Sequence, residues 1–390
     1  MKRLWLHVGM HKTGSSTIQT NLNAVRHHEG WRYIKVEKDK ANTNGAVHAM
    51  FSSHPAKYHT FRNHGANDEE LRKLGARLRR KLEARIRRAT EETLILSAES
   101  LSIMDRQGIA SLAEFLRPLV DEIRVIGYVR NPAEFISSNF QERVKHGKKT
   151  FRLSECAPKY RTRFRKFDAV FGKKQVDVVK FDPRAFTNHC VVRDFCERTG
   201  ISLPPGTVVK TVNEGLCARA CALLFTYYRF GPGYGVGKYV VRENRYIVRT
   251  LLAMKGAKFR LSGEIIAPEL ADQAEDLAWM ENRLGSALSR EAKPSADDVS
   301  REEDLLVVGL DTLREFGKRF GKITGTRPPR LPAATGGIVD PQAAATYVQT
   351  CRELAGEKLR KSGGRSIRKR KGPFARLLRR LKKSLGRADR

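Results

Sequence analysis

Residues 4–22 constrain the fold more than any other stretch, because they read as a buried strand, a loop and the first turns of a helix in direct succession. The run at 4–8, LWLHV, is short and apolar, as is typical of a strand inside a sheet. Gly9 and Gly14 give the following loop backbone freedom at both ends, and the helix begins at Ser15. Such a loop directs several unpaired backbone N–H groups at one point, so the sequence predicts a site for phosphate or sulfate there.

The position of the lysine distinguishes this loop from a nucleoside triphosphate loop. Gly9 and Gly14 have the spacing of a Walker A motif, which places Gly-Lys-Ser/Thr at the second glycine. Here Ser15 and Ser16 follow the second glycine, and the lysine of the loop, Lys12, precedes it. The lysine that reaches the β- and γ-phosphates is therefore missing, and we predict a shorter anion bound without a metal ion. The alternative interpretation is an ordinary strand-to-helix turn that contains a lysine by chance.

The pattern G-x-x-K-T-G-[ST]-[ST] after the first strand resembles the 5′-phosphosulfate loop of sulfotransferases. These enzymes use 3′-phosphoadenosine-5′-phosphosulfate (PAPS), and the resemblance implies that donor. It implies that Lys12 stabilises the charge that develops on the bridging oxygen as 3′,5′-adenosine bisphosphate leaves. It also implies that backbone N–H groups and hydroxyls hold the 5′-phosphate, and these belong to Thr13, Gly14, Ser15, Ser16 and Thr17.

A second signature follows the strand that we expect at 123–129. Arg130, Asn131 and Pro132 come directly after it, and the proline can start a helix that carries Ser138 about two turns further on. An arginine at a strand end and a serine on the next helix can converge on one phosphate, because the planar guanidinium offers paired donors. The spacing R-N-P-x5-S resembles the sulfotransferase element that holds the 3′-phosphate of PAPS. The resemblance implies that Arg130 and Ser138 bind this phosphate.

A general base for the acceptor hydroxyl is expected just past another buried strand, at 93–97. Glu99 follows this strand at its carboxyl end, where open α/β sheets bind their ligands. The sequence Ser-x-Glu after a buried strand resembles the catalytic-base region of glycan sulfotransferases, which implies that Glu99 accepts the proton. His11, inside the donor loop, is the alternative base. The structural alternative for Glu99 is an acid that stabilises the start of a helix.

The order of the remaining elements predicts the fold class. An amphipathic helix is expected at 69–92, where apolar residues recur at three- and four-residue steps, and a further strand at 176–181. With the strands named above, this order predicts a three-layer, P-loop-like α/β fold with a central, mainly parallel sheet flanked by helices. The histidine-dotted stretch 35–68 reads as a long loop that covers the donor or the acceptor. Further helices are expected at 108–119, from 183 to 196, from about 214, at 243–259, at 269–285 and at 340–360.

Two glycine-rich segments mark the later part of the chain. Residues 231–238 end in Lys238, and many sulfotransferases close a late glycine- and lysine-containing loop over the donor. The resemblance therefore makes Lys238 a candidate donor-binding residue, and a linker is the alternative. The Pro- and Gly-rich stretch 327–338 predicts a second linker. We expect a sulfotransferase-like catalytic domain at 1–326, this linker at 327–338, and a helix with a strongly basic tail at 339–390.

The charge of the chain indicates anionic partners. Lys and Arg total 75 against 42 Asp and Glu, a net charge of +33, and residues 360–390 hold 14 Lys/Arg and one acid. Leucines fall at helical spacing in this tail, so it could lie on an anionic membrane surface or stay solvated. No apolar run approaches the ~20 residues that span a bilayer. The six cysteines include no CxxC pair. We expect neither signal peptide nor membrane anchor, and a cytoplasmic protein that is at most peripheral at the inner face of the cell membrane.

The signatures together predict a PAPS-dependent sulfotransferase that acts on a hydroxyl of a carbohydrate or glycolipid. The resemblance is to bacterial carbohydrate sulfotransferases, and it implies neither a metal ion nor a specific nucleic acid partner. One alternative is a P-loop nucleotide kinase, which would need magnesium and a Walker lysine. The other is a non-catalytic basic protein that binds membrane or nucleic acid.

Overall fold

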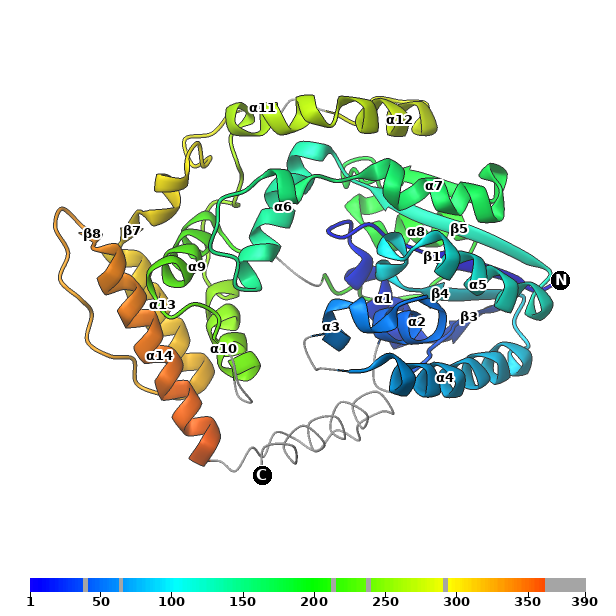
Figure 1. Ribbon diagram of the computed structural model, residues 1–390, viewed down its shortest axis with the longest axis horizontal. Coiled ribbons are helices and arrows are strands. Elements are labelled where there is room, and N and C mark those ends of the chain that lie inside the picture. Colours follow the sequence, from blue (N-terminus) through cyan, green and yellow to red (C-terminus); the bar gives the residue numbers. More distant parts are fainter. Residues whose placement is uncertain (38–40, 63–65, 212–214, 236–239, 290–293, 362–390) are drawn as a thin grey trace.

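A six-stranded sheet organises the first half of the molecule (Figure 1). The computed structural model describes residues 1–37, 41–62, 66–211, 215–235, 240–289 and 294–361. The strand order is β2-β3-β4-β1-β5-β6, and all neighbours pair in parallel except β2 and β3. The predicted α/β fold with a central, mainly parallel sheet is confirmed. The strands are β1 (Arg3–His7), β2 (His27–His28), β3 (Trp31–Tyr33), β4 (Thr93–Ser97), β5 (Glu122–Val129) and β6 (Val176–Lys180).

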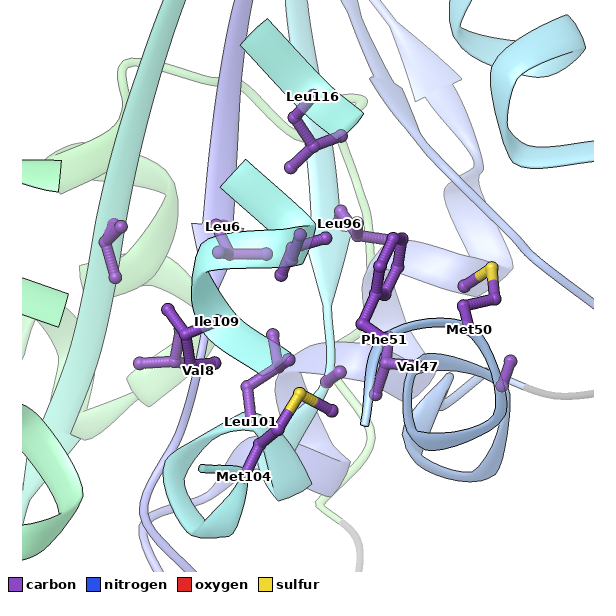
Figure 2. Close-up of a cluster of buried hydrophobic side chains, with 14 of the residues drawn as sticks. Leu6, Val8, Val47, Met50, Phe51, Leu96, Leu101, Met104, Ile109 and Leu116 are labelled. Atoms are coloured by element: carbon purple, nitrogen blue, oxygen red, sulfur yellow. The ribbon is translucent and has the colours of Figure 1, made fainter. Parts of the chain in front are cut away.

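The alternation of side chains along β1 explains why helices cover both faces of the sheet. Leu4 and Leu6 belong to one hydrophobic core, and Trp5 between them belongs to another. Figure 2 shows Leu6 and Leu96 packed with side chains of the helices on the first face. That face is covered by α2 (Asn44–Phe51), α4 (Asp68–Arg88), α5 (Arg106–Leu116) and α7 (Tyr160–Phe171), and the other by α1 (Ser15–Val25) and α8 (Val191–Thr199).

A helical half is joined to the sheet through α6 (Pro132–Lys145). Phe135 of α6 lies in the core of the sheet, whereas Ile136 and Phe140 lie in a second core made by the later helices. Within that core, α14 (Pro341–Lys361) packs against α9 (Ala218–Phe230) and α10 (Val240–Leu252) (Figure 1). The domain division at 327–338 stays a prediction. The later elements are α9 (Ala218–Phe230), α10 (Val240–Leu252), α11 (Gly263–Asp272), α12 (Ala274–Leu284), β7 (Val308–Gly309), α13 (Leu310–Thr324), β8 (Ile338–Val339) and α14 (Pro341–Lys361).

The prediction of a long loop at 35–68 was wrong, because much of this stretch is helical and packed on the sheet. It contains α2, a 3-10 turn at Pro55–Lys57 and α3 (His59–Arg62). These pieces are too short for helical periodicity to be visible in the sequence. His48 is buried in α2 and stacks on Tyr58, with ring centroids 4.0 Å apart. Burial lowers the pKa of His48 to about 4, so this histidine packs as a neutral ring.

Most other predicted elements appear close to their expected bounds, and three helices differ. The helix expected at 243–259 ends at Leu252, because the following backbone bonds elsewhere: Ala218 N–H donates to Ala257 O at 2.8 Å. The helix expected from 183 begins only at Val191, and the one expected at 269–285 is split into α11 and α12 at Gln273. The chain at 253–262 therefore does not continue α10, and it lies near the carboxyl ends of the strands.

Two predictions fall outside the described residues. Lys238 belongs to the stretch 236–239, and the basic tail is described only as far as Lys361. Over the part of the chain that the structure describes, no helix combines the length and the apolar character needed to cross a membrane. The proposed contact of the tail with a membrane surface stays a prediction.

Replacing Gly75 with alanine should destabilise the protein. Gly75 lies in α4 where that helix crosses α2, and a Cβ there would overlap the backbone carbonyl oxygen of Ala49. Alanine favours helices by about 1 kcal/mol over glycine, but forcing the two helices apart costs about 1–3 kcal/mol. We expect urea denaturation to show a net loss of unfolding free energy. The control Gly263→Ala, whose Cβ would meet nothing within 4 Å, should be neutral.

Candidate functional site

A cleft opens at the carboxyl ends of four parallel strands. Its volume is about 2480 Å³, and it is lined by the residues that follow these strands: Lys12 after β1, Glu99 after β4, Arg130 after β5 and Phe181 after β6. Helix α6 and the chain at 253–262 also line it. Because parallel strands bring their carboxyl ends to one edge, residues far apart in the sequence meet here.

The loop after β1 is shaped to present donors to an anion. Gly9 has a φ of 53°, and a Cβ there would lie 2.6 Å from Ser15 Oγ and 3.3 Å from Glu99 Cα, so glycine lets these segments approach. Gly14 caps α1 in the left-handed conformation without a side-chain hydrogen bond. Within the described chain, the buried Ser15 Oγ has no hydrogen-bond partner. A helix start with unpaired donors and an unpartnered hydroxyl fits a bound phosphate.

The side chain of Lys12 points to α6. Its Nζ donates to Glu142 Oε2 at 3.0 Å, and Lys145 Nζ donates to the same oxygen at 2.8 Å. Burial lowers the pKa of Lys12, and Glu142 opposes this shift. Burial alone would raise the pKa of Glu142, but the two lysines outweigh it and lower that pKa to about 2. Glu142 is therefore ionised, and its negative charge favours the charged form of Lys12.

Arg130 connects the two signatures that the sequence identified. Its guanidinium donates from Nη1 to the carbonyl oxygen of Lys12 at 3.1 Å and from Nε to Glu134 at 2.9 Å. It also lies 5.8 Å from the ring centroid of Phe181. The guanidinium is largely buried, with 12% of the side chain exposed. The arginine at the end of β5 thus fixes the loop after β1 and faces the same cleft.

Glu99 and His11 both line the cleft, but their pKa values are shifted in opposite directions. Burial raises the pKa of Glu99 to about 7, although Lys12 and Arg163 oppose this shift. Burial lowers the pKa of His11 to about 4, and the charge of Arg163 adds to the effect. A base is most effective when its pKa lies near the working pH, so Glu99 is the better placed of the two near neutrality.

Sequence reasoning missed Lys258, which lies near Arg130. Its pKa is lowered by burial first and then by the charges of Arg130 and Arg260. Lys258 lines the cleft from the chain at 253–262, and Leu261 N–H donates to Ser137 Oγ at 3.2 Å, which ties this segment to α6. Lys258 was not selected because it fell inside the helix expected at 243–259. Gly256, two residues earlier, was a sequence signal that this helix could end sooner.

The cleft collects most of the residues that the sequence selected, and their roles stay predictions. Thr13 is an exception, because its buried hydroxyl donates to Met10 O inside the loop and does not line the cleft. Glu142 and Lys145 were not predicted; only their spacing from Ser138, four and seven residues along one helix, signalled a shared face. The selected residues that line the cleft are His11, Lys12, Gly14, Ser15, Ser16, Thr17, Glu99, Arg130 and Ser138.

Among the described residues, no three His, Cys, Asp or Glu side chains gather in a way that could hold a metal ion. The prediction that the site works without a metal is not tested by this observation.

The solved structures that are similar to this chain include two sulfotransferase structures. One is the crystal structure of a sulfotransferase from Alicyclobacillus acidocaldarius, with 15% identity over 74% of this chain and 98% of that chain and a TM-score of 0.43. The other is the sulfotransferase domain of the olefin synthase from Synechococcus PCC 7002, with 14% identity over 65% and 96% of the two chains and a TM-score of 0.30. No protein-family model and no curated protein matches the chain.

The raised pKa of Glu99 predicts a pH-dependent cost to stability. The unfolded chain loses this proton near pH 4.5 and the folded protein near pH 7, so stability falls as the pH rises between these values. Glu99→Gln removes the cost and should raise the unfolding free energy by up to about 3 kcal/mol at pH 8. Urea denaturation of the same variant at pH 4, where both states hold the proton, is the internal control and should show little change. An equal gain at both pH values would contradict the raised pKa.

Proposed function

We propose that this protein is a PAPS-dependent sulfotransferase that acts on a hydroxyl of a carbohydrate or glycolipid. The observation that carries the proposal is the hydrogen bond from Arg130 Nη1 to Lys12 O, at 3.1 Å in the cleft. This contact brings the two donor-binding signatures to one place. A donor with phosphates at both ends needs cations at two positions of the same cleft, and Lys12 and Arg130 supply them.

The donor would be held mainly through its phosphates. The start of α1, with Ser15 and Ser16, offers N–H groups and hydroxyls to the 5′-phosphate. Arg130 and Ser138 offer a guanidinium and a hydroxyl to the 3′-phosphate, and Lys258 adds a second cation beside Arg130. PAPS, when bound, supplies the activated sulfuryl group.

The residues near Lys12 would carry the transfer step. Glu99 takes the proton of the acceptor hydroxyl while the hydroxyl oxygen bonds to sulfur. The bond between sulfur and the bridging oxygen breaks, and its electron pair goes to the 5′-phosphate of the departing 3′,5′-adenosine bisphosphate. Lys12 stabilises the charge that develops on this oxygen. His11, with a pKa of about 4, stays neutral and is the weaker base.

The size of the cleft supports a large acceptor. Sites for small ligands measure about 300–1,000 Å³, whereas this cleft has about 2480 Å³. The volume leaves room for several sugar units, or for a glycolipid head group, beside a bound nucleotide.

Binding of 3′,5′-adenosine bisphosphate tests the donor site. We expect calorimetry in EDTA to show binding that needs no magnesium, because the cations are protein side chains. Arg130→Ala and Lys258→Ala should each weaken it roughly tenfold or more, the range for a hydrogen bond to a charged group. The control Lys318→Ala, at an exposed lysine of α13, should bind as the wild type does. Magnesium-dependent binding, or none, would reject the proposal.

Transfer of label from PAPS to glycan and glycolipid extracts tests the chemistry. Glu99→Gln should keep donor affinity within about threefold and lose roughly 10²–10⁴ in turnover, the usual contribution of a general base. In the wild type, turnover should rise with pH through about 7, where Glu99 becomes ionised. An active Glu99→Gln with an inactive His11→Ala would assign the base to His11 instead.

A further inference from the structure

Glu142 has an arrangement that the proposed roles leave unexplained. Two ammonium groups, those of Lys12 and Lys145, donate to its single oxygen Oε2 at 3.0 and 2.8 Å. The other oxygen, Oε1, lies 3.7 Å from His146 Nδ1. The lysines are the more buried partners, with 16% and 10% of their side chains exposed, and the Glu142 side chain is 36% exposed. The carboxylate therefore lies on the open side of two buried cations.

Two buried ammonium groups that share one oxygen define a position for an anionic oxygen. Without an anion there, they would repel each other in a partly dry environment, and burial already lowers the pKa of Lys12. The pair carries two positive charges and the carboxylate one negative charge, so the cluster attracts a further anion even when Glu142 is in place. Lys12 is also the residue expected to contact the bridging oxygen of the donor, which places this position beside the transferred group.

We propose that Lys12 and Lys145 together bind the sulfuryl group of the donor, and that Glu142 occupies their shared anion position only while the donor is absent. This inference rests on the proposed function. When the donor binds, a sulfuryl oxygen replaces Glu142 Oε2 between the two ammonium groups. The carboxylate turns to the solvent-facing side of α6, where His146 is the neighbouring basic side chain. Lys145 is thereby assigned as a residue that contacts the transferred group.

PAPS and 3′,5′-adenosine bisphosphate provide a direct test, because they differ by the sulfuryl group alone. Affinities of both ligands are measured by calorimetry without an acceptor. Lys145→Met should weaken PAPS roughly tenfold, as expected for one charge-assisted hydrogen bond, and leave the affinity for the bisphosphate within twofold. The control Lys149→Met, at an exposed lysine on the segment after α6, should change neither. Equal losses for both ligands, or no loss for PAPS, would overturn the assignment.

A substitution at Glu142 tests the same proposal through an expected gain in PAPS affinity, and it does not depend on the folding of the Lys145 variant. Glu142→Gln removes the competing anion, so the affinity for PAPS should rise several-fold relative to that for the bisphosphate. Glu155→Gln is the matched control, because Glu155 also pairs with two cations, Arg143 and Lys148, but does not line the cleft. A fall in PAPS affinity in Glu142→Gln would show that the carboxylate supports the lysines and does not compete with the donor.

Binding of the bisphosphate also distinguishes a failure of the proposed function from a failure of the two-lysine sulfuryl site. If wild-type protein does not bind it, the proposed function fails. If it binds but the ratio of PAPS to bisphosphate affinity is unchanged in both variants, the donor site stands and the two-lysine sulfuryl site is rejected.

Discussion

The parallel pairing of β1 with both β4 and β5 is the constraint on which the site depends. Leu4 pairs with Leu94 on one side and with Ile123 on the other, so the three strands run in register and end at one edge. Both faces of these strands are buried, so the register between them is strongly specified. A shift of β1 by one residue would place Trp5 in the opposite core. The positions of Lys12, Glu99 and Arg130 follow from this register and from the few residues that separate each from its strand.

The two carboxylates near Lys12 show how environment separates chemical roles. Glu142 accepts direct hydrogen bonds from two lysines, and its pKa falls to about 2. Glu99 is buried, and the charge of the same lysine only partly opposes the effect of burial, so the pKa of Glu99 rises to about 7. Glu142 is thus ionised near neutral pH, whereas Glu99 can exchange a proton there. When the environment separates the pKa values of two carboxylates, one can stabilise charge while the other transfers a proton.

The elements predicted correctly from the sequence are those whose local sequence pattern agrees with their place in the tertiary structure. β4 and the loop after β1 were read correctly, because apolar runs and paired glycines are visible within a few residues. The helices at 44–62 were missed because they are short and are stabilised by packing on the sheet, with His48 used as an apolar ring. Lys258 was missed because the apolar pattern of α10 continues past Leu252, whereas the backbone there pairs with another element, as in the hydrogen bond from Ala218 N–H to Ala257 O. Glu142 and Lys145 belong to no recognisable sequence motif. Their position in the site depends on which side of α6 faces Lys12, and the sequence does not give that orientation.

The contact between Arg130 and Lys12 couples the two ends of the site. Lys12 has a φ of 71°, a left-handed conformation that costs a residue with a side chain about 1 kcal/mol or more. The hydrogen bond from Arg130 to the Lys12 carbonyl helps to offset this strain, so the arginine shapes the loop as well as facing the cleft. A group that binds Arg130 would then affect the loop that carries Lys12, without any movement of the sheet. Lys258 contributes charge beside Arg130 but comes from a different segment, so its effect on a bound phosphate is separable from the conformation of the loop. The site is therefore a strained loop held by a cation from the next strand, which links its geometry to the binding of an anion.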